Sequence, residues 1–176
     1  GSFNGIKLTY IHQEQALGTG HALLQAKKHI GGRFIVLNGD DLYSKEDILT
    51  LSKMDNSALV FERDNPSSFG VFVVQHDKVT DLIEKPKDID RGLCNIGCYV
   101  FDKNIFTELE KLEESPRGEY ELTDAIKGLI RSTGFNIQKI KGNWLTITFP
   151  WNLLDANEEL SNELSQDLLR HGEGGD

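Results

Sequence analysis

The sequence has no excess of positive charge, no long apolar stretch and almost no cysteine. Its 176 residues carry 19 Lys and Arg against 28 Asp and Glu, a formal net charge of −9. Nucleic acids and anionic membranes bind proteins largely through basic side chains, so neither is an expected partner. No apolar run approaches the roughly 20 residues of a membrane-spanning helix, and no secretion signal opens the chain. We therefore expect a soluble, cytoplasmic protein, for which a small phosphorylated ligand remains compatible.

The two cysteines, Cys94 and Cys98, lie in one apolar run. In a strand, residues four apart point to the same face but are too far apart for easy bridging. No histidine or further cysteine completes a metal set. We expect two buried, reduced thiols.

Short apolar, β-branched runs alternate with helical patterns along the chain. The expected strands are Leu8–Ile11, Phe34–Leu37, Ala58–Phe61, Val71–Val74, Val79–Ile83, Gly97–Phe101 and Ile137–Ile140. The expected helices are Gly20–Ile30, Lys45–Lys53, Lys103–Glu113, Thr123–Ser132 and Pro150–Leu164. This alternation predicts an α/β fold, a Rossmann-like mixed, mainly parallel sheet with helices on both faces. The strands between Ala58 and Phe101 lack a long intervening helix and predict an antiparallel or mixed insertion. We expect one domain over residues 3–165 and a frayed tail over 166–176.

Polar and glycine-rich segments follow the strands, where ligands bind in open α/β sheets. After the first expected strand, Gln13 precedes Gly18-Thr19-Gly20 at the start of a helix. One interpretation is a tight turn with Thr19 as the helix N-cap. The other is backbone approaching a flat ligand, with the Gln13 amide meeting a base edge.

Asn38-Gly39-Asp40-Asp41 follows the second expected strand. Asn and Asp at such a position often form a hydrogen-bonded turn. A Mg²⁺ site is equally compatible, because Mg²⁺ favours one or two carboxylates plus substrate phosphates.

Glu84-Lys85-Pro86 closes another expected strand. A strand stopped by proline, with a solvated ion pair, would explain these residues. So would a sugar site in which Glu84 accepts hydrogen bonds from hydroxyls and Lys85 meets a phosphate. For Asn95 with Gly97, and for the segment 118–124, a structural and a ligand-binding interpretation are both compatible with the residues.

The order of the motifs is more specific than any one of them. From about Leu8 to Leu164 the chain resembles the sugar-1-phosphate nucleotidylyltransferases. The motifs that carry the resemblance are Gln-x-x-x-x-Gly-Thr-Gly-His-Ala, Asn-Gly-Asp, Phe-Gly-Val, Glu-Lys-Pro, Asn-x-Gly-x-Tyr, Gly-Glu-Tyr-Glu-Leu-Thr-Asp and Pro-Trp-x-Leu-Leu-x-Ala-Asn. The segment Gln13–Ala22 resembles N-acetylglucosamine-1-phosphate and glucose-1-phosphate uridylyltransferases in particular. The resemblance implies an enzyme with the nucleotide-diphospho-sugar transferase type of fold.

The resemblance also implies a reaction. A sugar 1-phosphate oxygen attacks the α-phosphorus of a nucleoside triphosphate, expected to be UTP, with Mg²⁺ as cofactor, giving a nucleotide sugar and pyrophosphate. Asp40 and Lys85 would be the catalytic residues, Asp40 as the Mg²⁺ ligand and Lys85 at the sugar phosphate. The matching nucleotide-binding positions are Gln13, Gly18, Thr19, Asn38 and Gly39, and the sugar-binding positions are Gly70, Glu84, Asn95 and Thr123.

Two parts of the family pattern are not matched. The Gly-x-Gly-Thr-x-Arg loop that wraps the triphosphate in the family, within a βαβ unit of roughly 30 residues, has no counterpart before Gln13. Thr146 stands where the family's Trp-x-Asp-x-Gly places a second metal-binding aspartate. We therefore expect this chain to be inactive alone, and to self-associate or pair with the segment that would complete its sheet.

Two functions follow from these residues. The first is nucleotidyl transfer to a sugar 1-phosphate, and the alternative is a non-catalytic nucleotide-sugar-binding or assembly module on the same fold. A dinucleotide-dependent oxidoreductase fits the alternation of elements but not the residues, because no Gly-x-Gly-x-x-Gly turn is present.

Overall fold

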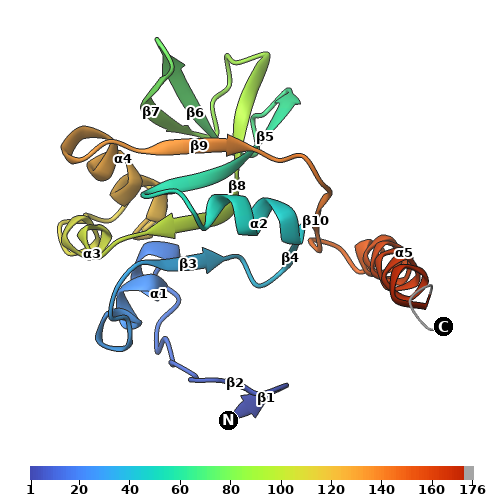
Figure 1. Ribbon diagram of the computed structural model, residues 1–176. Helices are drawn as coiled ribbons and strands as arrows, with labels where there is room; N and C mark the ends of the chain where they lie inside the picture. Colours follow the sequence, from blue (N-terminus) through green and yellow to red (C-terminus); the bar gives the residue numbers. More distant parts are fainter. Residues whose placement is uncertain (173–176) are drawn as a thin grey trace.

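The computed structural model describes residues 1–172 and has one main sheet flanked by helices (Figure 1). The strands are β1 (Ser2–Phe3), β2 (Ile6–Lys7), β3 (Phe34–Leu37), β4 (Asp41–Tyr43), β5 (Ser57–Asp64), β6 (Gly70–Gln75), β7 (Lys78–Glu84), β8 (Arg91–Phe101), β9 (Asn136–Lys139) and β10 (Trp144–Thr146). The helices are α1 (Thr19–Gln25), α2 (Lys45–Leu51), α3 (Asn104–Leu109), α4 (Leu122–Ser132) and α5 (Asn152–Gly172), with a short 3₁₀ helix at Lys27–His29.

The long strand β8 organises the main sheet. The order is β7-β6-β8-β5-β9, and β3 also pairs with β8. Because β3, β5 and β6 all run antiparallel to β8, and β9 runs parallel to β5, these four strands share one direction. The predicted mixed α/β fold is confirmed, as is the antiparallel pairing expected between Ala58 and Phe101. Within the main sheet, β5 and β9 form the parallel hydrogen-bonded pair.

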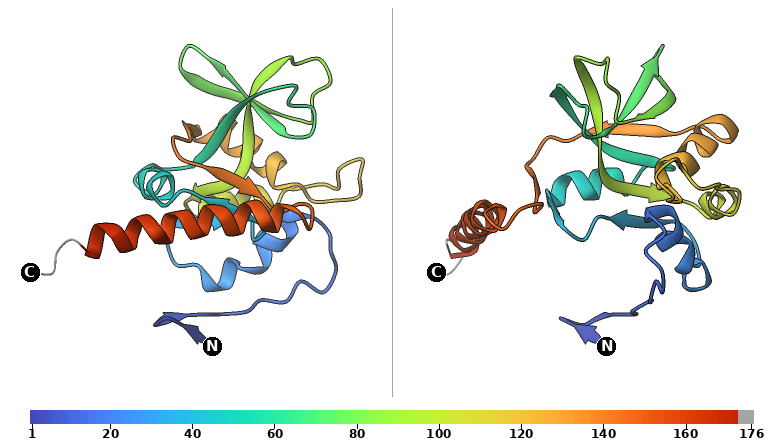
Figure 2. Two further views of the ribbon diagram at one scale, coloured as in Figure 1. Left: turned by 90° about the vertical axis from the view of Figure 1, so that its right-hand side faces the viewer. Right: turned by 180° about the vertical axis from the view of Figure 1, so that it is seen from behind.

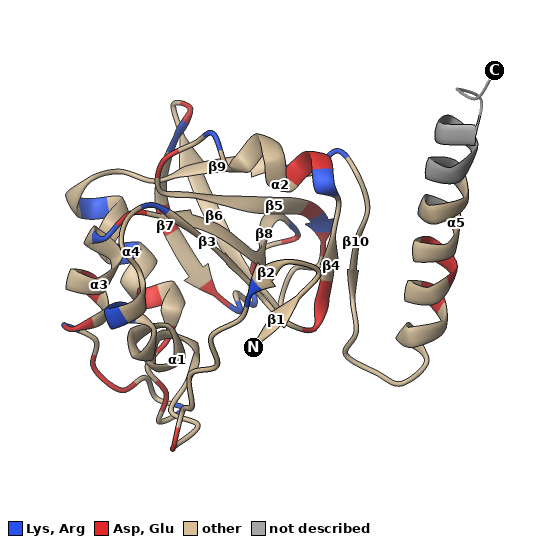
Figure 3. Ribbon diagram, turned by 60° about the horizontal axis from the view of Figure 1, so that its bottom comes forward, with Lys and Arg blue, Asp and Glu red and all other residues tan. Residues whose placement is uncertain are grey.

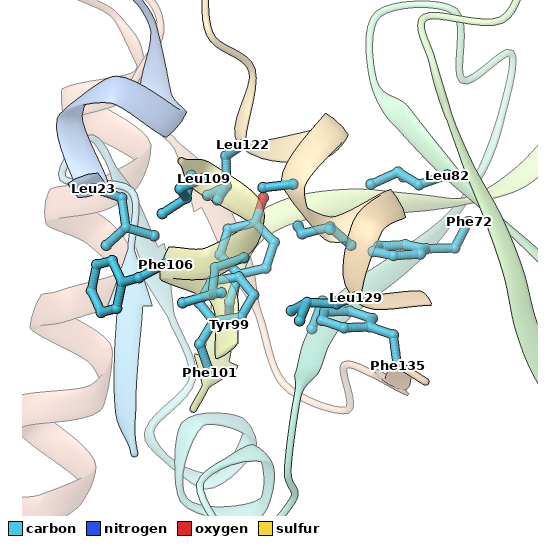
Figure 4. Close-up of a cluster of buried hydrophobic side chains, with 14 of the residues drawn as sticks. Leu23, Phe72, Leu82, Tyr99, Phe101, Phe106, Leu109, Leu122, Leu129 and Phe135 are labelled. Atoms are coloured by element: carbon cyan, nitrogen blue, oxygen red, sulfur yellow. The ribbon is translucent and has the colours of Figure 1, made fainter. Parts of the chain in front are cut away.

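Alternation along β8 divides the core between two faces of the sheet. Tyr99 and Phe101 point toward α1, α3 and α4, whereas Cys98 and Val100 point toward α2. This follows from the period of two in a strand. Figure 4 shows the first cluster, in which α4 contributes buried residues at the helical spacing of its apolar stripe, among them Leu122 and Leu129. Helices therefore cover both faces, as predicted.

Both cysteines are reduced and buried, as expected. Burial raises the pKa of the Cys98 thiol to about 12 and also raises the pKa of Cys94. Neither thiol is poised as a nucleophile.

The expected strand Leu8–Ile11 is wrong. This segment forms no regular structure in the described chain, and Tyr10 is 83% exposed. A short apolar, β-branched run forms a strand only beside a partner strand, and these residues pair with none of the described strands. The hairpin β1–β2, turning at Asn4-Gly5 with positive φ at both residues, was not predicted. Nor were the three-residue strands β4 and β10, which pair with each other.

Helix α5 extends well beyond the expected end at Leu164, through Gly172, into the residues predicted to fray. The rest of that predicted tail, 173–176, lies outside the described residues. Figure 2 and Figure 3 show α5 standing beside the body of the fold, and its main contact is with β10. No helix in the described chain has the length and apolar character needed to cross a membrane.

Candidate functional site

The strand pairing along β8 is interrupted where the predicted motifs meet. One edge of β8 pairs with β5, and the opposite edge pairs first with β6, at Leu93 and Cys94, and then with β3, from Cys98 onward. Residues 95–97 of β8 therefore lie between the two neighbouring strands. Such a point, where adjacent strands diverge, leaves backbone and side chains available for a ligand.

Asn38 and Gly97 pack against each other at this interruption. The backbone N–H of Asn38 donates to the Gly97 carbonyl over 2.9 Å. Gly97 has φ +75°, and a Cβ there would lie 2.0 Å from Asn38 Nδ2. Glycine is therefore required at position 97 both by the left-handed backbone and by the approach of Asn38.

In the turn after β3, the adjacent carboxylates of Asp40 and Asp41 have different surroundings. Asp41 Oδ2 lies 3.1 Å from Asn38 Nδ2 and 3.0 Å from the Tyr43 hydroxyl. Burial, followed by the nearby Asp41 carboxylate, raises the pKa of Tyr43 far above its usual range. Asp40 is exposed, and its backbone carbonyl accepts from the N–H of Ile147 over 2.8 Å, while its carboxylate has no hydrogen-bond partner among the described residues. Asp40 is thus the carboxylate that remains available to a metal or ligand.

The segment that carries Gln13 docks against the residues before α4. Gln13 Nε2 donates to the Gly18 carbonyl over 3.2 Å. Gly18 has φ +101°, and a Cβ there would lie 2.8 Å from the Tyr120 carbonyl oxygen. The Gly20 N–H donates to that same carbonyl over 2.9 Å. Glycine at both positions allows the start of α1 to approach this backbone closely.

Thr19 does not cap α1. The N-cap residue is Gly18, and Thr19 is the first residue of the helix. Its hydroxyl instead accepts a hydrogen bond from the Leu122 N–H over 3.3 Å. The interpretation of Thr19 as an N-cap was therefore wrong, and its hydroxyl helps join α1 to the start of α4.

Three of the predicted sugar-binding residues are neighbours across β6, β7 and β8. Gly70 pairs with Glu84, and a Cβ at Gly70 would lie 3.1 Å from Glu84 Oε2 and 3.7 Å from Asn95 Cβ. Asn95 Nδ2 donates to the Tyr99 hydroxyl over 2.7 Å. Burial raises the pKa of Tyr99, so this hydroxyl stays neutral and holds the Asn95 amide in place.

The fourth predicted sugar residue, Thr123, lies in the first turn of α4. Its hydroxyl is buried and has no hydrogen-bond partner in the described chain.

Lys85 follows Glu84 with φ +46°, and its N–H donates to the Phe69 carbonyl over 2.9 Å. Its side chain is exposed and makes no described ion pair. Gly39 is exposed with open space around it.

Arg117 connects the sugar-side residues to the loop before α4, and the sequence analysis missed it. Its Nη2 lies 2.6 Å from Glu121, 3.8 Å from Glu119 and 4.0 Å from Glu84. The hydrogen bond to Glu121 raises the pKa of Arg117. A local signal existed, since Arg117 and Glu121 are four residues apart, but no sequence pattern indicates the contact with Glu84.

These contacts form one continuous path that brings together predicted residues from distant segments. The path runs, in order, through Gln13, Gly18, Tyr120, Glu121, Arg117, Glu84, Gly70, Asn95, Gly97, Asn38 and Asp41. This path has the Gln13 amide at one end, the Asp41 carboxylate at the other, and Arg117 with its carboxylate partners between them. It is suited to a ligand with a hydrogen-bonding base, hydroxyls and phosphate groups.

Comparison with known proteins gives the family of the chain. The sequence model of a family described as nucleotidyl transferase matches residues 1–163. The chain belongs to that family. Members of the nucleotidyl transferase family with curated names include a "Bifunctional protein GlmU" from Methanococcus aeolicus, 43% identical over 168 residues that cover 94% of this chain. The chain spans 41% of the length of that relative.

This chain spans a larger share of two further proteins. A "UTP--glucose-1-phosphate uridylyltransferase AglF" from Haloferax volcanii is 33% identical, over 93% of this chain and 71% of the relative. A crystal structure of a UDP-glucose pyrophosphorylase complexed with UDP-glucose superposes with a TM-score of 0.72, at 23% identity, over 88% of this chain and 66% of the other. At that identity the structural likeness concerns the fold alone, and it agrees with the predicted fold type.

Proposed function

We propose that this chain is a nucleotidyl-transfer domain that joins a nucleotidyl group to a sugar 1-phosphate and releases pyrophosphate. The observation that carries the proposal is the continuous path from Gln13 to Asp41, which brings the side chains of Gln13, Glu84 and Asn95 together with the half-buried Asp41, next to the exposed Asp40. The name of the AglF relative supports the same reaction class and UTP as donor.

In the proposed site each group of residues has one task. Gln13, Gly18 and Thr19 hold the base, with Asn38 and Gly39 beside the rest of the nucleotide. Glu84, Asn95 and their neighbours Gly70 and Thr123 bind the sugar, so that its phosphate lies near Lys85. The reaction needs no covalent enzyme intermediate, because positioning and charge neutralisation carry phosphoryl-type transfers. The ammonium group of Lys85 would attract the sugar phosphate and stabilise charge as its oxygen attacks the α-phosphorus.

The donor set is compatible with Mg²⁺ held partly by substrate. The described residues contain no group of three or more acidic, His or Cys side chains that could hold a metal by themselves. Asp41 is occupied by Asn38 and Tyr43, which leaves the exposed Asp40 carboxylate. Mg²⁺ accepts one carboxylate plus water and phosphate oxygens. When bound there, Mg²⁺ would neutralise phosphate charge during transfer.

The proposal is tested by measuring pyrophosphate release from UTP, a panel of sugar 1-phosphates and Mg²⁺ in a longer form of the protein that also carries the glycine-rich loop. Lys85→Met should lower kcat/KM by roughly 10²–10³-fold, the usual effect of removing one preorganised charge-stabilising group. The matched control is Lys87→Met, an exposed lysine two residues along the same loop. Equal activity of the two variants would contradict the role of Lys85, and full activity in Asp40→Asn would contradict the metal site.

A second candidate function is a non-catalytic nucleotide-sugar-binding or assembly module, and Thr146 favours it. Thr146 pairs directly with Asp41 across β4 and β10, where a second carboxylate would strengthen metal binding. We propose that this chain binds nucleotide sugars but has little or no turnover alone, because the Thr146 hydroxyl supplies no charge to a metal. Saturable UDP-sugar binding without pyrophosphate release, in any longer form of the protein, would select the binding module.

We further propose that β3 associates with another strand, from a second copy or a complementary segment. Among the described strands β3 pairs only with β8, and Ile35 and Leu37 are 40% and 45% exposed. An unpaired edge with exposed apolar residues favours strand addition. Sedimentation velocity over a range of concentrations should show association that Leu37→Lys reduces and Leu49→Lys, on α2, does not. Identical monomeric behaviour of all three proteins would refute the association.

A further inference from the structure

A hollow lies between strand β7 and helix α4, next to the residues of the proposed sugar site. Its volume is about 590 Å³, a size typical of small-molecule sites. The hollow is lined by five consecutive residues of β7, 80–84, and by Lys127 and Arg131 of α4. Glu84, the carboxylate proposed to bind the sugar, lies at the end of this run. The hollow therefore begins at the sugar site and extends away from it.

The sugar site and the hollow are on the same face of the sheet. A Cβ at Gly70 would lie 3.1 Å from Glu84 Oε2 and 3.3 Å from Leu82 Cδ1, so these groups share one face. Leu82 belongs to the core cluster that α4 covers, as Figure 4 shows. A ligand held by Glu84 on this face would thus have the hollow beside it.

Helix α4 continues the site along the hollow. Thr123, whose buried hydroxyl has no partner among the described residues, lies in its first turn. Lys127 and Arg131 follow at intervals of four residues, which places all three side chains along one side of the helix. A helix rises about 6 Å over four residues, so Lys127 lies one turn beyond Thr123. A sugar that meets Thr123 would have its far side near Lys127.

The far part of the hollow carries two neighbouring cations. Arg131 Nε donates to the Lys127 backbone carbonyl over 3.2 Å, which orients the guanidinium, and Arg131 has no ion pair within the described part of the chain. The Lys127 ammonium pairs with Asp124 over 2.8 Å. Asp81, on β7, accepts from the backbone N–H of Leu82 over 2.8 Å. Like charges four residues apart repel in a helix, and a bound anion would offset that repulsion.

We propose that the hollow receives an acidic substituent of the sugar, so that the chain prefers nucleotide sugars of the uronate class. The inference rests on the proposed function, in which the sugar phosphate lies near Lys85. Lys85 follows Glu84 on the side opposite to the hollow, so the part of the ring remote from the phosphate faces Lys127 and Arg131. The forked donors of arginine match a carboxylate, and the lysine adds a second charge.

Two ligands that differ only at C6 of the sugar test the preference. Calorimetry should show that the chain binds UDP-glucuronate about tenfold or more tightly than UDP-glucose, the usual effect of one hydrogen bond to a charged group. The difference should shrink as the salt concentration rises, because salt screens partly exposed charges. Equal or weaker binding of UDP-glucuronate at low salt would overturn the proposal.

Variants assign the preference to the two cations. Arg131→Gln keeps a donor for the Lys127 carbonyl but removes the charge, and it should reduce the ratio of the two affinities, as should Lys127→Gln. The matched control is Lys111→Gln, because Lys111 pairs with Glu108 over 3.0 Å at the same spacing as Lys127 with Asp124. It should keep the ratio of the unaltered protein. An unchanged ratio in the double variant Lys127→Gln with Arg131→Gln would contradict the assignment.

The ratio also separates ligand recognition from other effects. Arg131 lies in the last turn of α4, where a cation stabilises the helix end. A role confined to that end would weaken the binding of both ligands equally and leave their ratio unchanged. Binding of UDP and UDP-glucose without a preference for the acidic sugar would overturn this inference alone. Failure of every form to bind uridine nucleotides would overturn the proposed function as well.

Discussion

Replacement of Gly97 by alanine should separate a loss of ligand binding from a loss of stability. A Cβ at Gly97 would lie 2.0, 2.3 and 2.6 Å from three atoms of the Asn38 side chain. Asn38 is exposed, so its side chain can move aside without disturbing the core. The movement would break the 3.1 Å contact with Asp41 and withdraw Asn38 from the proposed nucleotide site.

The loss of stability comes mainly from the backbone. Alanine in the left-handed region at φ +75° costs about 1–2 kcal/mol. For a chain of this size that corresponds to a fall in Tm of roughly 2–8 °C. Gly134→Ala is the matched control, because Gly134 has φ +84° with nothing within 4 Å of a Cβ. The two variants should melt at similar temperatures.

Only Gly97→Ala should lose affinity for a uridine nucleotide, by about tenfold or more if one polar contact is lost. Calorimetry on the two variants and the unaltered protein measures this difference. In the double variant Asn38→Ala with Gly97→Ala the clash is gone, so it should bind no more weakly than Asn38→Ala alone. Equal nucleotide affinity of Gly97→Ala and Gly134→Ala would refute the reasoning.

Three further predictions concern stability, metal binding and thiol reactivity. Asp47 is 2% exposed and accepts from the backbone N–H groups of Lys141 and Gly142, in the loop after β9, at 2.9–3.1 Å. Asp47→Ala should therefore lower the free energy of unfolding, measured in urea, by about 2–3 kcal/mol. Replacement of its exposed neighbour, Glu46→Ala, should change that free energy little. Thr146→Asp should make Tm and nucleotide affinity rise more steeply with Mg²⁺; a Mg²⁺ response equal to that of the unaltered protein would count against a metal site there. Because burial raises both thiol pKa values, Cys94 and Cys98 should stay protonated at neutral pH and react with a thiol reagent only after denaturation, and rapid labelling of the folded protein would contradict their burial.

The main strands and helices could be predicted from local patterns, because the apolar residues that they bury lie together in short segments of the sequence. Short apolar, β-branched runs identified β3 and β5 to β9, and helical patterns identified α4. The same reasoning failed where partners decide structure. Leu8–Ile11 was predicted in the same way but has no strand beside it, and β4 and β10 are each too short to be recognised without the other.

The sequence named candidate site residues one by one but not their arrangement. Motif order named Gln13, Asp40 and Glu84, which are far apart in the chain. Nothing local indicates that Arg117 reaches Glu84, or that Tyr99 holds Asn95. The positive φ of Lys85 could not be predicted either, because it depends on the turn after β7, in which the Lys85 N–H donates to the Phe69 carbonyl.

The sequence by itself determined the class of fold, the residue types available to a ligand and the family, because periodicity and motif order survive without coordinates. Only the tertiary structure decided which of those residues meet. The divergence of β3 and β6 along one edge of β8 places Asn38 on Gly97 and Gly70 beside Glu84 and Asn95. Hydrogen bonds between distant residues depend on ångström-scale approach, which no linear pattern encodes.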